Sequence, residues 1–189
     1  MLLINLNRGV IRIDEICSYQ TERIDYNLID AERFVSTENM LQNCEGVLNY
    51  EGVPNVDSVI KYRSGDILVS NIRPYLQKIW LADCDGGCNP DVLVIRVNDT
   101  TKFNPKYVYY ALRRKAFFDH MMSGKTGVKM PRGNKVNNLR FEIPNINLDE
   151  QNQVLSEVLS IEAKISAAQK AMEECIVNKS SLIKDTLFD

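Results

Sequence analysis

The last quarter of the chain constrains the fold most, because it has the pattern of one uninterrupted helix. Residues 149–186 contain neither proline nor glycine, the two residues least compatible with a helix interior. Asn147, followed by Glu150 three residues later, has the spacing of a capping box that begins a helix. A helix over residues 149–186 would extend for ~57 Å at ~1.5 Å per residue. A helix of that length cannot fold back on one small domain over its whole length, so we expect its seam to need a partner helix. The alternative is a helix packed along its own domain.

Side chains along this helix repeat at alternating spacings of four and three residues, which is the heptad pattern of a coiled coil. Lys179 and Thr186 are the polar interruptions of the seam. Further apolar residues widen the stripe, which favours a bundle or an additional contact surface over a bare two-stranded coil. We expect a spacer and dimerisation element whose seam is formed by Val154, Val158, Ile161, Ile165, Ala168, Met172, Cys175 and Leu182.

The preceding residues are typical of a β-rich domain. Short apolar or alternating runs are separated by turn-forming residues, and the turn expected at 83–90 contains Gly86-Gly87. One helix is expected after Asn104-Pro105, with an apolar side reaching Phe117. The fold class is therefore α+β: a mixed β-rich domain at 1–146 and a long coiled-coil-type helix at 147–189. Strands are expected at 10–13, 33–36, 58–62, 67–70, 78–82, 92–97 and 140–143.

The charge of the chain is unevenly distributed. The formal net charge is −2, which argues against a uniformly basic nucleic-acid binder. Residues 102–140 nevertheless contain ten Lys or Arg and only one acid, Asp119. The loop 124–135 lies within this window and combines three glycines with four basic residues. Such a loop is either a solvated surface or a face for a polyanion, and the asymmetry favours the polyanion.

Composition excludes several classes of protein. No apolar run approaches the ~20 residues that span a bilayer, and the N-terminus lacks the organisation of a secretion signal, so we expect a cytoplasmic protein without a membrane partner. Five cysteines in no framework spacing fit a reducing compartment. Cys84 and Cys88 are the only close pair, and the single histidine, His120, is distant in sequence. We therefore expect no metal site and no cofactor.

No catalytic constellation is found. Gly124-Lys125-Thr126 matches the end of a phosphate-binding P-loop, but Asp119 stands where its first glycine belongs, and a helix instead of a strand precedes it. Asn89-Pro90-Asp91 is similar to the NPP[YF] tetrapeptide of amino-methyltransferases but lacks the aromatic residue that stacks on a flipped base. A Ser-His-Asp triad would have to use His120, and no nucleophile is indicated near it.

Two segments carry side chains suited to DNA. The turn 70–75 combines small polar groups, a guanidinium and an aromatic ring, and Arg73 could pair with guanine and Asn71 with adenine. The lysines of the basic loop suit phosphates, whereas Arg132 and Asn134 are its better candidates for base edges. The alternative is a structural turn with Tyr75 packed inside. The candidate DNA-binding residues are Ser70, Asn71, Arg73, Tyr75, Lys78, Lys125, Thr126, Lys129, Arg132, Asn134 and Lys135.

Four stretches in this order resemble one family. They are Val35-Ser36-Thr37-Glu38-Asn39-Met40, the run from Gly65 to Tyr75, Lys129-Met130-Pro131-Arg132-Gly133, and Ile143-Pro144 leading through Glu150-Gln151 into the long helix. The match that they define extends over nearly the whole chain. The sequence is similar to the DNA specificity (S) subunit of type I restriction-modification systems, in a half-subunit form with one target recognition domain.

The resemblance implies a target recognition domain that reads one half of a split site in double-stranded DNA. It implies that the helix sets the spacing between two such domains and docks methyltransferase (M) subunits, joined by a restriction and motor (R) subunit. The S subunit of this family is not itself an enzyme. The usual subunit holds two domains and two helices. This sequence is therefore either a half-subunit that homodimerises through antiparallel helices or one half of a longer polypeptide.

A different class of protein is also compatible with the residues. In that alternative, the chain is a coiled-coil assembly protein whose β-rich domain binds a protein or a peptide, and the basic loop is only a solubilising surface. Salt-dependent binding to DNA or heparin separates the two classes, because binding through phosphates weakens steeply with salt.

Overall fold

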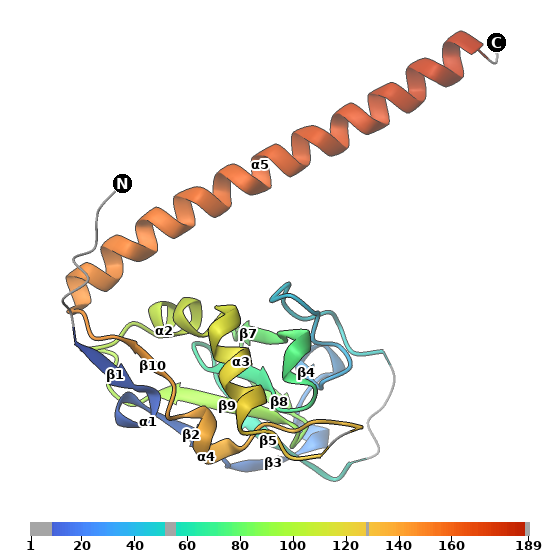
Figure 1. The fold of residues 1–189 in the computed structure, drawn as a ribbon. Coiled ribbons are helices and arrows are strands. Elements are labelled where there is room, and N and C mark those ends of the chain that lie inside the picture. The colour runs from blue at the N-terminus through green and yellow to red at the C-terminus, as the bar shows by residue number, and fades with distance from the viewer. Residues whose placement is uncertain (1–8, 52–55, 128, 188–189) are drawn as a thin grey trace. The chain divides into compact units, whose positions relative to one another are not determined.

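Two four-stranded sheets and a two-stranded ribbon form the β structure of the described chain (Figure 1). The computed structural model describes residues 9–51, 56–127 and 129–187. Contacts divide the chain into two compact units, Met1–Gln151 and Asn152–Asp189. A mixed β domain followed by a long C-terminal helix was predicted from the sequence, and this fold class is confirmed.

The first sheet has the order β2-β9-β6-β7 and is antiparallel throughout. Its central strand β9 is a run of Val, Leu and Ile side chains buried almost continuously, as expected for a strand covered on both faces. The neighbouring β6 is buried over its whole length. The strands span Cys17–Gln20 (β2), Ile67–Ser70 (β6), Ile79–Leu81 (β7) and Val92–Val97 (β9).

The second sheet has the order β3-β5-β8-β4, with β4 and β8 parallel. The expectation that residues 83–90 form only a turn is wrong, because Gly86–Cys88 is strand β8. A Cβ atom on Gly86 would lie 2.3 Å from the Arg33 carbonyl, and one on Gly87 would lie 2.3 Å from Val59. The two glycines thus permit close approach of this strand to Arg33 and to β5. The other strands are Arg23–Asp25 (β3), Phe34–Val35 (β4) and Ser58–Tyr62 (β5).

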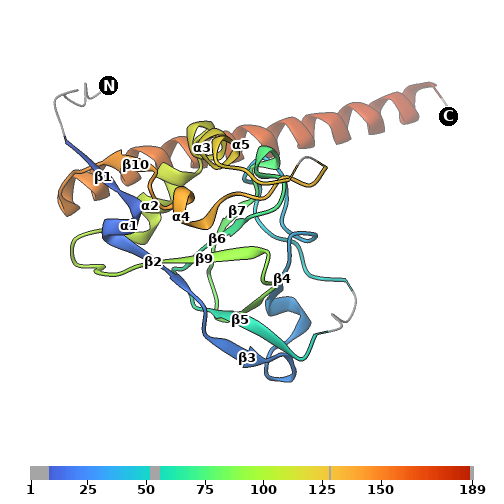
Figure 2. The same cartoon turned by 60° about the horizontal axis from the view of Figure 1, so that its bottom comes forward.

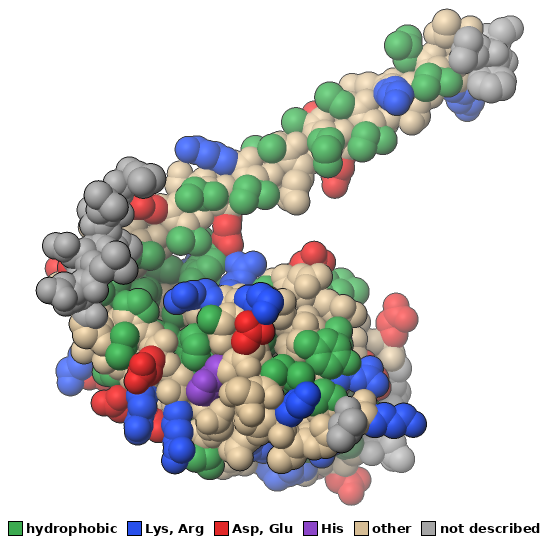
Figure 3. Space-filling view, in the orientation of Figure 1, with side chains coloured by type: hydrophobic (Ala, Val, Ile, Leu, Met, Phe, Trp, Pro, Cys, Tyr) green, Lys and Arg blue, Asp and Glu red, His purple; other side chains and the backbone are tan. Residues whose placement is uncertain are grey.

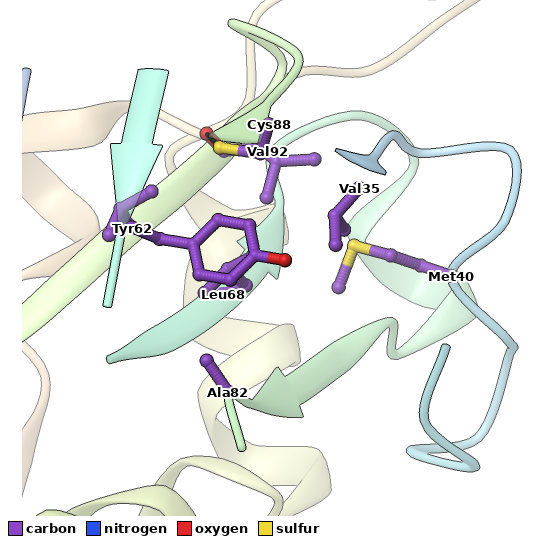
Figure 4. Packing of buried hydrophobic residues seen from close by; sticks show 8 residues of the cluster. Val35, Met40, Tyr62, Leu68, Ala82, Cys88 and Val92 are labelled. Atoms are coloured by element: carbon purple, nitrogen blue, oxygen red, sulfur yellow. Dashed lines mark hydrogen bonds between the residues drawn. The ribbon is translucent and has the colours of Figure 1, made fainter. Parts of the chain in front are cut away.

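Buried side chains from both sheets meet in one cluster (Figure 4). Tyr62 points into it with its ring fully buried, and its hydroxyl donates to the Arg33 carbonyl at 2.8 Å. The polar end of the largest core side chain therefore has a partner, as burial requires. The cluster comprises Val35, Met40, Tyr62, Leu68, Ala82, Cys88, Val92 and Val94.

An antiparallel ribbon joins the first strand of the described chain to the last. Strand β1 (Val10–Arg12) pairs with β10 (Glu142–Pro144), and Ile11 stands opposite Ile143. A short helix, α1 (Ile13–Ile16), follows β1. Three 3₁₀ turns complete the connections, at Tyr26–Leu28 (η1), Ala31–Arg33 (η2) and Pro74–Leu76 (η3).

Two helices occupy the place where one was expected. The predicted start is confirmed, since the Asn104 side chain caps α2 (Pro105–Leu112) by accepting from the Lys106 amide. The single continuous helix is wrong, because Arg114 adopts extended backbone geometry and α3 (Lys115–Ser123) begins anew. This break lets both segments bury apolar residues. A further short helix, α4, spans Lys135–Asn138.

The long helix α5 spans Leu148–Leu187 in 40 residues, close to the predicted extent. Its capping box is confirmed: the Glu150 amide donates to Asn147 at 3.0 Å, and the Asn147 amide donates to Glu150 at 3.1 Å. The buried Gln151 side chain accepts from the Asn104 amide and donates to the carbonyls of Lys102 and Ile146. These bonds tie the first helical turn to the first unit, and the two units divide after Gln151.

The remainder of α5 exposes apolar side chains along its length (Figure 3). Ile161, Ile165, Met172 and Leu182, all on the predicted seam, have more than half of their surface exposed. Within the described segments, no helix is both long and apolar enough to cross a membrane.

Candidate nucleic-acid interface

The basic loop between α3 and α4 is a small hairpin (Figure 2). Thr126 and Arg132 exchange two backbone hydrogen bonds of 2.9 Å each. Gly127 has a φ of +82°, a conformation that favours glycine at the turn. The two bonds hold Thr126 and Arg132 side by side within the described part of this loop.

The hairpin is attached to the 70–75 turn through the backbone. The Arg73 amide donates to the Pro131 carbonyl at 2.8 Å, and the Gly133 amide donates to the Asn71 carbonyl at 3.0 Å. Ile72 and Arg132 form an antiparallel bridge. The two segments that the sequence singled out separately therefore form one continuous surface.

Gly133 is required where the two segments meet. It is buried, and a Cβ atom there would lie 2.9 Å from Asn138 Nδ2 and 2.9 Å from Asn71 Oδ1. The Asn138 amide group itself donates to Asn71 Oδ1 at 3.3 Å. A side chain at position 133 would force the Asn71 and Asn138 amide groups to shift.

The turn holds Arg73 in an unusual backbone conformation. Its φ of 49° and ψ of 60° place it in the left-handed region, where a non-glycine residue is strained by roughly 1–3 kcal/mol. Pro74 then begins η3, and Tyr75 is 52% exposed. The tertiary structure thus directs Arg73 and Tyr75 outward, and the alternative of a tyrosine packed in the core does not occur.

Exposed cations gather on this combined surface. They come from the turn, the two sides of the hairpin and the start of α4. Arg132 is paired with a carboxylate, since its Nη2 atom donates to Asp91 Oδ2 at 3.1 Å. The exposed cations are Arg73, Lys125, Lys129, Arg132 and Lys135.

Lys78 lies beside the surface in a more enclosed position. Its Nζ atom donates to the Thr37 carbonyl at 2.6 Å. Burial lowers the pKa of Lys78, and the positive charge of Arg73 lowers that pKa further, whereas Glu38 opposes the shift. Lys78 therefore binds the backbone at Thr37 and also adds positive charge beside the surface.

Three other candidates have structural partners. Ser70 is buried and its hydroxyl donates to the Ile72 carbonyl at 3.0 Å, while the buried Asn71 bonds to Asn138. Asn134 caps α4 by accepting from the Asn137 amide at 3.1 Å. These side chains shape the turn and the loop. Thr126 is exposed in the hairpin.

Two residues outside the sequence-based set belong to the same surface. Asp91 binds Arg132, and Met130 is 48% exposed at the hairpin. Both line an open hollow of about 430 Å³ together with Glu38, Arg73 and Lys78. The sequence placed Asp91 in the Asn89-Pro90-Asp91 motif, but nothing in that motif indicated its partner, because the partner lies 41 positions away.

Other chemistry has little support in the described residues. In those ranges, no three His, Cys, Asp or Glu side chains are grouped so as to hold a metal ion. His120 Nε2 lies 2.7 Å from the Asn137 carbonyl oxygen, so the histidine connects α3 to the residues after the hairpin. Burial raises the pKa of the Cys17 and Cys88 thiols to about 12, which keeps them protonated and unreactive.

Comparison with known proteins finds similar sequences and structures. No protein-family model matches the sequence. The chain is 23% identical over 127 residues to the specificity subunit of the type I restriction enzyme EcoDI from Escherichia coli, an alignment covering 67% of this chain and 28% of that protein.

Solved structures show the same fold over nearly the whole chain. The HsdS subunit from Thermoanaerobacter tengcongensis matches with a TM-score of 0.71 at 22% identity, covering 96% of this chain and 48% of that one. A second match is a chain from a structure described as the basis of complex assembly and conformational transition of the type I R-M system. Its TM-score is 0.72 at 21% identity, and the match covers 99% of this chain and 50% of that one. The S subunit from M. genitalium matches at 0.60 and 17% identity, covering 91% and 44%.

The fold is a mixed β domain followed by a long C-terminal helix, similar to the solved S subunits. The predicted resemblance to the specificity subunit of type I restriction-modification systems is confirmed by these similarities. The chain spans about half of the length of the solved structures it matches.

Proposed function

We propose that this chain is a sequence-specific DNA-binding unit of a type I restriction-modification complex and recognises one half of a bipartite site. The observation that supports this most directly is the backbone attachment of the basic hairpin to the 70–75 turn. That attachment joins forked guanidinium groups, which suit base edges, to lysines, which suit phosphates. In this proposal, Arg73 and Arg132 read bases, and Lys125, Lys129 and Lys135 contact the phosphates of the DNA.

The chemistry of the complex is assigned to its partners. The methyltransferase subunits modify the DNA and the restriction subunit cleaves it, while this chain is non-catalytic and determines where they act. The related structure on assembly of the type I R-M system supports such partners. The protein works in the cytoplasm, where its DNA is.

The helix would bring a second recognition domain to the other half of the DNA site. Its exposed apolar seam needs covering, and an antiparallel pair of identical helices would place two recognition domains at opposite ends. A two-fold symmetric dimer reads a near-palindromic bipartite sequence. The same surface would serve if the second domain belonged to the same polypeptide, in which case the two half-sites would differ.

Methylome sequencing tests the function as a whole. Hosts with the gene, without it, and with the gene restored are compared. We expect a bipartite methylated motif that disappears on deletion and returns on restoration. Motifs that persist unchanged in the deleted host would refute the proposal. A symmetric motif would support the homodimer, and an asymmetric one would support two different domains.

A further inference from the structure

Arg132 forms an ion pair with Asp91. Among the exposed cations in the described part of the hairpin and the turn, only Arg132 has such a carboxylate partner. Arg132 Nη2 donates to Asp91 Oδ2 at 3.1 Å, and the two side chains are 53% and 32% exposed. We propose that Asp91 is a positioning residue that orients the Arg132 guanidinium toward one base pair and so determines specificity there. This inference rests on the proposed DNA-reading function.

The pair differs from an ordinary surface ion pair because both backbones are fixed. The Asp91 amide donates to Asn89 Oδ1 at 2.8 Å, and the Asp91 carbonyl accepts from the Asn71 amide at 2.8 Å. The Asn71 carbonyl in turn accepts from Gly133, the neighbour of Arg132. Exposed ion pairs between mobile side chains gain little. Here the short chain of backbone bonds through Asn71 makes the carboxylate a fixed reference point for the guanidinium.

The chemistry of guanine recognition benefits from such a reference. Arginine reads guanine by presenting two parallel N–H donors to O6 and N7, which requires the planar guanidinium to keep one orientation. A carboxylate bound to Nη2 restrains that plane and leaves the remaining donors of the five for DNA. The negative charge of Asp91 also disfavours a phosphate at the same place, so Arg132 is kept from binding the phosphate backbone of the DNA.

A competing explanation is that Asp91 only reduces the positive charge of the surface. Glu38 provides the matched control, because it is a second carboxylate lining the same hollow and is exposed. Glu38→Gln removes the same charge without touching the Arg132 contact. Asp91→Ala removes both the charge and the contact, and Asp91→Asn keeps an oxygen that can accept from Nη2.

The experiment measures sequence discrimination by the complete complex with its methyltransferase partners. Variants Asp91→Ala, Asp91→Asn, Arg132→Ala, Glu38→Gln and the Asp91→Ala/Arg132→Ala double variant are assayed on duplexes carrying each base pair at each site position. We expect Asp91→Ala to reduce discrimination by roughly three- to tenfold, part of what a bidentate arginine supplies, at the same base pair that Arg132→Ala affects. The double variant should lose no more than Arg132→Ala alone. Asp91→Asn should retain part of the discrimination, and Glu38→Gln all of it.

Several results would overturn the inference. For Asp91→Ala, these are a uniform rise in DNA binding with unchanged discrimination, or a loss of discrimination at a base pair other than the one that Arg132→Ala affects. For the double variant, the contrary result is a loss equal to the sum of the two single losses. For Arg132→Ala, it is unchanged discrimination although the wild-type complex is specific. Unchanged discrimination for Arg132→Ala would also remove Arg132 from the proposed base-reading residues, but none of these results refutes recognition of a half-site by the chain. A wild-type complex that shows no sequence preference would remove both. Thermal unfolding of each variant identifies a loss that comes from misfolding.

Discussion

The backbone amide of Arg73 donates a hydrogen bond to the carbonyl oxygen of Pro131 at 2.8 Å. Through this bond, a strained turn and a glycine-rich hairpin become parts of one surface. Neither segment would hold its side chains in a reproducible arrangement alone, because loops of this composition sample many conformations. Joined together, they form one surface that carries Arg73 from the turn and Lys129 and Arg132 from the hairpin.

Enlarging Gly133 should force the Asn71 and Asn138 amide groups to shift. In Gly133→Ala, the new Cβ would lie within 3 Å of two buried amide side chains, which overpacks the site by roughly 1–3 kcal/mol. We expect a lower free energy of unfolding and a loss of specific DNA recognition, measured by chemical denaturation and by methylation assays.

The matched control for this change is Gly9→Ala. Among the described residues, no atom lies within 4 Å of a Cβ built at Gly9, so this variant should resemble the wild type. Equal stability and equal recognition of the two variants would show that the close approach at Gly133 has no importance.

Removing a lysine of the basic loop 124–135 should weaken binding to all DNA sequences alike. Lys129 and Lys135 are exposed, and a phosphate contact contributes about one unit to the slope of log affinity against log salt. Binding of Lys129→Ala or Lys135→Ala to mixed-sequence DNA, measured from low to high salt, should show a flatter slope. Lys61→Ala is the control, since Lys61 lies on β5 and pairs with Glu22 at 3.1 Å. A slope that falls equally for Lys61→Ala would argue against a specific phosphate surface.

Replacing Arg73 should change specificity more than affinity. If Arg73 reads a guanine, Arg73→Ala removes ~1–3 kcal/mol of discrimination at one base pair, and the methylated motif becomes degenerate there. Deep sequencing of methylated sites measures this directly. A motif that stays fully specific would exclude Arg73 as a base-reading residue, even if overall methylation falls.

Charges on the seam of α5 should prevent self-association. Ile161 and Ile165 are 56% and 52% exposed, and burying an isoleucine contributes ~1.5–3 kcal/mol. Ile161→Lys or Ile165→Lys should weaken association roughly tenfold or more, measured by analytical ultracentrifugation. Ala163→Lys, an exposed position off the seam, should have little effect. An unchanged association constant for both isoleucine variants would place the interface elsewhere.

Stability should fall in alkaline solution because of buried thiols. Burial raises the pKa of Cys17 from 9.0 to about 12. Above about pH 9 the unfolded state therefore loses this proton while the folded state keeps it, and the free energy of unfolding decreases until about pH 12. Denaturation at a series of pH values should show a flatter decline for Cys17→Ala than for the wild type. Cys175→Ala, at an exposed thiol, should follow the wild-type curve, and identical curves for all three would contradict the assignment.

Local sequence patterns were enough for the elements that depend on near neighbours. The capping box of Asn147 and Glu150 formed as expected because both partners lie within one helical turn. Strand β9 follows from a run of β-branched and aliphatic residues. Patterns failed where distant contacts decided: Gly86 and Gly87 form a strand because they pair with β4 and β5, which lie far away in the sequence.

The sequence by itself determined the long helix, the β-rich class and the location of the positive charge, because heptads, strand periodicity and charge are written in consecutive residues. Only the tertiary structure decided which groups meet: the hairpin with the turn, Asp91 with Arg132, and Asn71 with Asn138. It also decided that Ser70 and Asn71 are buried while Arg73 and Tyr75 face outward. The physical reason is that backbone hydrogen bonds between distant segments fix these orientations, and short-range patterns carry no information about their partners.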